Sequence, residues 1–233
     1  SHTYADGPAP YTIEVEATDE DGTWGPFTKT VTVNDVAPTV NLRGEGEVYE
    51  GSLFTLMIDP PDDPGDDTIN QYAINWGDGS AVETLLAPEA LSAGFVPSLS
   101  AYHTYADDGT HTVTVTGTDE DGTHPLDSVS VTVNNVAPEF EDIPDQTLLP
   151  SAKGVFSLNN IAFDDPGEDI WNGTVNFGDG AGYQSLTIDS VNKTFDLLNT
   201  YTAEGNYSVS VTLEDGDGGS HTDTFELEVF SNT

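Results

Sequence analysis

Residues 113–133 read VTVTGTDEDGTHPLDSVSVTV, and this stretch decides the fold class. Apolar and polar residues alternate in the runs at its two ends, and a period of two is typical of half-buried β-strands. The acidic segment TDEDGT, which contains a glycine, separates the two runs. Because Asp and Gly favour tight turns, the stretch predicts two strands joined by a turn, with no helix.

The same pattern occurs more than once in the chain. Residues 18–23 (TDEDGT) and 31–38 (VTVNDVAP) both recur 100 positions later, the second with a single substitution. A fainter third copy follows, since the Gly-Asp-Gly of the second copy returns further along the chain. Internal repeats of this kind predict tandem domains. We expect a partial repeat at 1–36, a full repeat at 37–136 and another at 137–233, cut from a longer array.

The repeats also predict the architecture. Short, β-branched runs with alternating polarity follow one another about every ten residues, separated by Gly, Pro and Asp, which is typical of an antiparallel β-sandwich. A repeat length near 100 residues is that of an immunoglobulin-like domain. The sequence therefore predicts an all-β chain of tandem immunoglobulin-like β-sandwich domains that begins with a partial repeat.

The composition excludes several classes of function. The 233 residues include 42 acidic and 4 basic side chains, for a net charge of -38, and no cysteine. This charge repels nucleic acid and anionic membrane surfaces, and the lack of cysteine removes disulfides and thiolate chemistry. No apolar run approaches the ~18 residues of a membrane span. We therefore expect neither nucleic-acid binding nor membrane insertion.

Two motifs carry a resemblance to a known family. INWGDG at 74–79 and VNFGDG at 175–180 are each followed by a Thr-Tyr pair, at Tyr105 and Tyr201, and then by an alternating strand and an Asp-rich turn. In order and spacing these motifs resemble the PKD (polycystic kidney disease) domains, immunoglobulin-like modules found in tandem in secreted and surface proteins. The resemblance covers essentially the whole chain. The family often shows Asp-Pro-Asp-Gly, whereas here Asp-Pro-Gly is followed by two further aspartates.

Several motifs that recur within the chain have a structural interpretation. Glycine permits the positive φ of a tight turn, so Gly-Asp-Gly is expected to connect strands rather than to bind phosphate. Tyr105 and Tyr201 occupy the position at which sandwich domains tie down a corner through a tyrosine hydroxyl. His103 and His111 are expected to be structural, because the last repeat has Asn199 and Tyr207 in their places.

Carboxylates are concentrated where an immunoglobulin-like sandwich brings three segments to one end: the linker, the second-to-third strand loop and the loop before the last strand. Five or so carboxylates at one pole repel each other unless a cation neutralises them, and hard oxygen ligands on loops favour calcium. The resemblance implies the same site, because PKD domains of secreted bacterial collagenases bind calcium at this pole. The predicted ligands of the middle repeat are Asn34, Asp35, Asp62, Asp63, Asp66, Asp67, Asp119 and Asp121. Those of the last repeat are Asn134, Asn135, Asp164, Asp165, Asp169, Asp215 and Asp217. The alternative is that these acids are solvated turn residues.

No catalytic template fits the chain, which lacks a Gly-x-Ser-x-Gly elbow and a His-Glu-x-x-His motif, so we expect no enzyme activity. The sequence predicts a calcium-stiffened spacer or adhesion stalk of a large secreted or cell-surface protein, of prokaryotic origin, whose partners are neighbouring repeats of the chain. An alternative is an accessory module of a secreted hydrolase that binds polysaccharide or protein at the cell surface through Trp24 and Trp171. In a third interpretation the acid excess is an adaptation to high salt without a specific divalent site.

Residues 1–36 contain only the last two strands of a repeat. An isolated two-stranded hairpin is marginal in water, and its open edges can recruit another chain. We expect this hairpin to dock on the middle domain or to pair with the hairpin of a second molecule.

Overall fold

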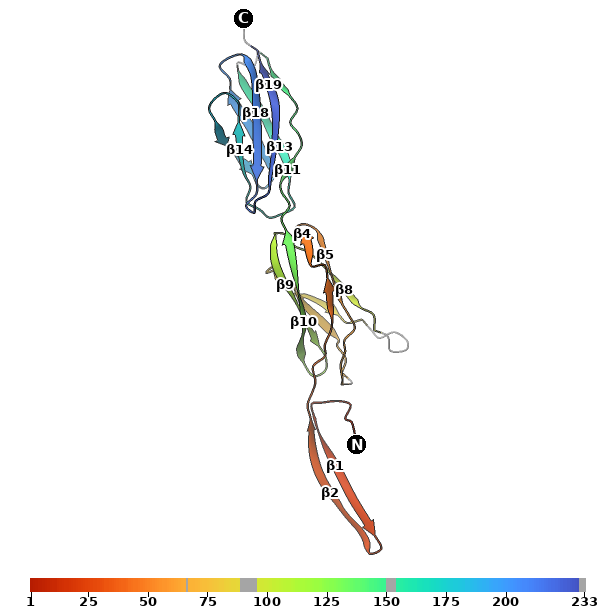
Figure 1. Cartoon of the computed structure of the whole chain (residues 1–233). Coiled ribbons are helices and arrows are strands. Elements are labelled where there is room, and N and C mark those ends of the chain that lie inside the picture. The colour runs from red at the N-terminus through yellow and green to blue at the C-terminus, as the bar shows by residue number, and fades with distance from the viewer. Residues whose placement is uncertain (66, 89–95, 150–153, 231–233) are drawn as a thin grey trace. The chain divides into compact units, whose positions relative to one another are not determined.

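The computed structural model describes residues 1–65, 67–88, 96–149 and 154–230, and Asp66 therefore lies outside the described residues. Every regular element among these residues is a β-strand (Figure 1). The predicted all-β, tandem immunoglobulin-like fold class is confirmed. None of the described residues lies in a helix long and apolar enough to cross a membrane.

The chain folds into two compact units that do not follow the repeat numbering. The first unit comprises Ser1–Glu47, Leu53–His103 and Thr110–Thr132; the second comprises Val48–Ser52, Thr104–Gly109 and Val133–Thr233. Three short segments of the middle repeat, at 48–52, 104–109 and 133–136, thus belong to the compact unit of the last repeat. The predicted boundaries at 36/37 and 136/137 describe sequence repeats and stay a prediction.

The middle repeat is built from two sheets. The smaller sheet has the strand order β3 (Leu42–Gly44), β5 (Leu53–Ile58), β8 (Leu99–Thr104). The larger sheet has the strand order β4 (Glu47–Tyr49), β10 (Thr123–Asn134), β9 (Gly109–Thr118), β6 (Gln71–Asn75), β7 (Glu83–Leu86). Val113 and Val115 of β9 and Val131 and Val133 of β10 are buried, while the threonines between them are exposed or half-buried. The alternation in the opening stretch of sequence therefore marks the core-facing side of two paired strands.

The last repeat forms a second sandwich. One sheet has the strand order β11 (Glu139–Phe140), β13 (Val155–Asp164), β17 (Thr194–Thr200), β16 (Ile188–Asp189). The other sheet has the strand order β12 (Gln146–Leu148), β19 (Ser220–Val229), β18 (Gly205–Glu214), β14 (Asn172–Asn176), β15 (Tyr183–Ser185). Strand β12 runs parallel to β19, and β18 pairs antiparallel with both β19 and β14. Burying the apolar faces of both sheets accounts for the stability of this unit without cysteine.

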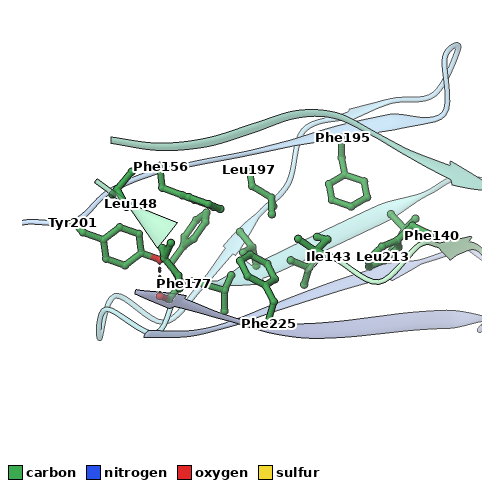
Figure 2. Close-up of a cluster of buried hydrophobic side chains, with 14 of the residues drawn as sticks. Phe140, Ile143, Leu148, Phe156, Phe177, Phe195, Leu197, Tyr201, Leu213 and Phe225 are labelled. Atoms are coloured by element: carbon green, nitrogen blue, oxygen red, sulfur yellow. Dashed lines mark hydrogen bonds between the residues drawn. The ribbon is translucent and has the colours of Figure 1, made fainter. Parts of the chain in front are cut away.

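The core of the last repeat is rich in phenylalanine and leucine (Figure 2). Phe177, Phe195, Leu197, Leu213 and Phe225 are at most 2% exposed. At one end of this core the hydroxyl of Tyr201 donates a hydrogen bond to the backbone carbonyl of Phe177 over 2.9 Å, shown dashed in Figure 2. The predicted tyrosine tie is thus present at Tyr201.

The Gly-Asp-Gly turns are structural in both repeats. Gly77 has a φ of 85°, and a Cβ placed there would lie 2.5 Å from the carbonyl oxygen of Thr112, so only glycine fits. Although burial opposes ionisation, hydrogen bonds from Ser80 and His103 lower the pKa of Asp78 to about 2. The His103 Nε2 atom lies 2.6 Å from an oxygen of Asp78. His103 therefore holds the turn, in agreement with its structural interpretation.

The N-terminal hairpin consists of β1 (Ala9–Asp19) and β2 (Gly22–Val33), which form a two-stranded sheet of their own (Figure 1). Its apolar side chains are open to solvent, with Val15 56%, Trp24 58% and Phe27 64% exposed. Docking of this apolar face on the middle repeat stays a prediction. Pairing with a second molecule stays a prediction.

Candidate metal centres

The first acidic cluster lies in the first compact unit and consists of Asp6, Asp67 and Asp121. One carboxylate oxygen from each lies within 4.8 Å of the other two. The Oδ1 atom of Asp67 is buried and has no hydrogen-bond partner. Burial, followed by the neighbouring Asp6, raises the pKa of Asp67 to about 6. The cluster therefore holds a carboxylate whose charge is poorly solvated and opposed by other acids.

The second acidic cluster lies in the second compact unit and has two overlapping parts. Carboxylate oxygens of Glu50, Asp107 and Asp169 lie within 4.8 Å of one another, as do those of Asp107, Asp108 and Asp217. Both carboxylate oxygens of Asp169 are buried, and no donor reaches either of them. Burial, followed by Asp165 and Glu50, raises the pKa of Asp169 to about 8.

The two clusters are copies of one arrangement. Asp67 and Asp169 both follow an Asp-Pro-Gly segment and end its loop, and Asp121 and Asp217 are the second aspartates of matching Asp-x-Asp-Gly turns. The third position of the first cluster, Asp6, follows Tyr-Ala, as Asp107 does in the second cluster. Each cluster therefore combines acids from two successive sequence repeats: Asp6 with Asp67 and Asp121 in the first, and Glu50, Asp107 and Asp108 with Asp169 and Asp217 in the second.

Glycine in the Asp-Pro-Gly loop allows the acid two residues later to turn inward. A Cβ on Gly167 would lie 2.2 Å from the Oδ2 atom of Asp169, and a Cβ on Gly65 would lie 2.6 Å from the Oδ2 atom of Asp67. A side chain at either position would therefore displace the carboxylate of the acid two residues later. The loop of the second unit is closed by the Gly167 amide, which donates to the Oδ1 atom of Asp165 over 2.9 Å.

Asp119 and Asp215 build the turns that carry the cluster residues. The Oδ1 atom of Asp119 accepts hydrogen bonds from the amides of Asp121 (3.0 Å) and Gly122 (2.9 Å). In the second unit the Oδ1 atom of Asp215 accepts from the Asp217 amide (2.9 Å), and its Oδ2 atom accepts from the side-chain amide of Asn135 (3.0 Å). Despite the opposing effect of burial, the Asn135 and backbone hydrogen bonds lower the pKa of Asp215.

Comparison with known families identifies the chain. Two models of the PKD domain match it, one over residues 39–133 and the other over residues 135–229. The chain belongs to the PKD domain family. Its two PKD domains lie in tandem, and PKD domains are typically non-catalytic modules that are usually extracellular.

Several solved structures resemble parts of this PKD chain. The PKD domain of an M14-like peptidase from a Thermoplasmatales archaeon is 24% identical, with a TM-score of 0.34, and the match covers 42% of this chain and 96% of that one. The FN1–FN3 domains of chicken CNTN1 are 14% identical, with a TM-score of 0.34 and coverage of 84% and 68%. Extracellular cadherin domains 1–5 of protocadherin gamma B2 are 16% identical, with a TM-score of 0.37 and coverage of 98% and 46%. Likeness at these TM-scores carries no argument about function. No curated protein matches the chain.

Only some of the predicted ligands enter the PKD clusters. The predicted residues found there are Asp67, Asp121, Asp169 and Asp217. Asp63, Asp119, Asp165, Asn135 and Asp215 lie beside them and hydrogen-bond to loop or turn groups.

Of the remaining described residues, two lie in strand pairings and three lie next to the clusters. Asp62 is exposed and forms a backbone bridge with Thr39, and Asp164 is exposed and pairs with Glu139 across β11 and β13. Asn34 and Asp35 line the same hollow as Asp6 and Asp67, and Asp35 lies 3.9 Å from His124. The Asn134 carbonyl accepts a hydrogen bond from the amide of Glu50, a residue of the second cluster.

Four acids of the clusters are not among the predicted ligands: Asp6, Glu50, Asp107 and Asp108. The shared Tyr-Ala-Asp at 4–6 and 105–107 is a signal that could have revealed two of them, but only its tyrosine was assigned a role. Glu50 has no visible copy in the repeats, so no pattern pointed to it.

Trp171 requires a correction, because it does not form an exposed binding face. Its Nε1 atom donates to the Oδ2 atom of Asp165 over 2.8 Å, and its ring packs against the core of the last repeat. The Nζ atom of Lys193 lies 4.8 Å from the centre of the Trp171 ring. Trp171 therefore covers the edge of the core and anchors a buried acid.

Proposed function

We propose that this tandem PKD segment is a non-catalytic spacer or adhesion stalk of a secreted or cell-surface prokaryotic protein, and that calcium stabilises it at the two acidic clusters. One observation carries the proposal. Equivalent acids from successive repeats are brought together twice, and in both clusters a carboxylate oxygen, on Asp67 or on Asp169, is buried without a donor.

The donor set suits calcium better than other metals. The cluster residues offer only carboxylate oxygens, and they come from loops and turns rather than from a rigid all-protein cage. Oxygen-only ligands on adaptable loops favour calcium, whereas transition metals favour nitrogen and sulfur ligands. Asp67, Asp121, Asp169 and Asp217 would contribute ligands, together with Asp6, Glu50, Asp107 and Asp108.

Calcium in this role stabilises the fold and performs no chemistry. Extracellular modules bind calcium with dissociation constants of roughly 10⁻⁴ to 10⁻³ M. At a free concentration ten times the dissociation constant, one ion adds about 1.4 kcal/mol to the free energy of unfolding. This is enough to hold the end of one repeat against the loops of the next, which is what a stalk under load requires.

An accessory binding module is the second candidate function. One observation favours it: Trp24 is 58% exposed on the N-terminal hairpin. The packing of Trp171 removes the other aromatic ring on which that hypothesis depended. A flat carbohydrate-binding face needs more than one exposed ring, so the spacer function is preferred.

Thermal unfolding in matched salts tests the proposal. We expect millimolar calcium chloride to raise the unfolding midpoint, and sodium chloride at equal ionic strength to leave it much less changed. Asp67→Asn and Asp169→Asn should each remove part of the calcium increment. An equal response to both salts would support adaptation to high salt and contradict the calcium proposal.

A further inference from the structure

Glu50 is the most deeply buried acid of the second cluster. The residue is 1% exposed, and its Oε1 atom accepts a hydrogen bond from the Val136 amide over 2.8 Å. Its Oε2 atom is buried and has no hydrogen-bond partner. An oxygen of this carboxylate lies within 4.8 Å of oxygens of Asp107 and Asp169. A buried charge with an unused acceptor is costly unless a cation lies beside it.

The backbone around Glu50 fixes its position. Its own amide donates to the Asn134 carbonyl over 3.1 Å, and the next amide, of Gly51, donates to the Tyr105 carbonyl over 2.9 Å. Across the cluster, the Glu168 amide donates to the Ala106 carbonyl over 2.8 Å. These bonds tie the segments that carry Glu50, Asp107 and Asp169 to one another inside the second compact unit. The buried carboxylate of Glu50, held by the Val136 amide, therefore lies in the cluster before any ion binds.

The first cluster has no equivalent group. Asp6 and Asp121 are exposed and Asp67 is half-buried, and among the described residues no glutamate joins them. Asp6 is followed by Gly7, whereas the matching Asp107 is followed by Asp108, which adds another carboxylate to the second cluster. The two clusters thus differ in charge and in rigidity, the two properties by which proteins tune calcium affinity.

We infer that Glu50, Asp107 and Asp169 form a calcium site of a different class from that at Asp6, Asp67 and Asp121, and that calcium fills the Glu50 site first. This inference rests on the proposed function, since it assigns an order to the same ions. The Glu50 carboxylate also accepts the Val136 amide, so loading this site connects the ion to the segment between Asn134 and Pro138. The second cluster therefore stays loaded at calcium concentrations that leave the first one empty.

Isothermal titration of the full chain with calcium chloride tests the inference. We expect two classes of site that differ about tenfold or more in dissociation constant, consistent with the range over which ligand charge and rigidity tune such sites. Glu50→Gln should remove the tighter class and leave the weaker one unchanged. Asp67→Asn is the matched control, and it should remove the weaker class only.

A second variant keeps the test decisive if Glu50→Gln disturbs folding. Asp107 is exposed, so Asp107→Asn should fold normally and weaken the tighter class by about tenfold or more. Two classes that both survive Glu50→Gln, or two sites of equal affinity, would overturn the inference while leaving the calcium proposal intact. Absence of any calcium binding by the unmodified chain would overturn both.

Discussion

Asp169→Asn removes one negative charge from the second cluster and keeps the shape of the side chain. Oxygens of Asp169, Glu50 and Asp107 lie within 4.8 Å of one another. At that distance a pair of carboxylates repels by roughly 1 kcal/mol in water and roughly 3 kcal/mol at an effective dielectric constant of 20. In the absence of calcium, and at about pH 9.5, where Asp169 is ionised, we therefore expect the variant to be more stable than the natural chain by about 1–3 kcal/mol.

The same substitution should have the opposite effect when calcium is present. Asparagine supplies one neutral oxygen in place of a carboxylate, so the calcium increment of the second unit should be lost. Differential scanning calorimetry at about pH 9.5, in EDTA and in calcium chloride, measures both effects. The variant should unfold several degrees higher than the natural chain in EDTA and should gain less from calcium.

Asp142→Asn is the matched control for this experiment. Asp142 is an exposed aspartate of the same compact unit and lies outside the acidic clusters. Its replacement should leave the calcium increment unchanged. A midpoint in EDTA that falls in Asp169→Asn, or a calcium increment that persists in it, would refute the electrostatic reasoning.

Four further predictions follow from the structure. Folding raises the pKa of Asp169 from 3.8 to about 8, so between these pH values the calcium-free folded state holds a proton that the unfolded chain releases. The free energy of unfolding should therefore fall as the pH rises from about 4 to 8 and should level off above pH 8. Urea titrations at several pH values should show this fall, and it should be weaker in Asp169→Asn. Tyr201→Phe leaves the Phe177 carbonyl without its donor and should cost about 1–3 kcal/mol in urea unfolding, with or without calcium. Gly167→Ala places a Cβ 2.2 Å from an oxygen of Asp169, so calorimetric titration should show loss of the second site only. Light scattering should show a dimer that becomes a monomer when residues 1–35 are removed; monomers in both cases would contradict pairing through the hairpin.

The strands and the core were predictable because both depend on local periodicity. Val113, Val115, Val131 and Val133 alternate with polar residues in the sequence, and the same four side chains are buried in the structure. The Gly-Asp-Gly turns were also predictable, since the glycines there adopt positive φ values that other residues avoid.

The acidic clusters were predictable only in part. The sequence pointed to the loops that carry Asp67 and Asp169, because their Asp-Pro-Gly motifs repeat. It assigned the ligands to each repeat and its linker, whereas the structure adds acids from the preceding repeat, Asp6 and Asp107. Such long-range contacts leave no periodic signal, and for Glu50 not even a repeated motif marks the position.

A crystal structure of the chain grown in calcium chloride, with anomalous difference maps, tests the central claim most directly. The account predicts one calcium peak bounded by Glu50, Asp107 and Asp169 and another bounded by Asp6, Asp67 and Asp121, each with oxygen ligands at about 2.3–2.6 Å. Well-ordered acidic loops with no peak at either cluster in saturating calcium, or peaks confined to Asp62 and Asp164, would contradict it.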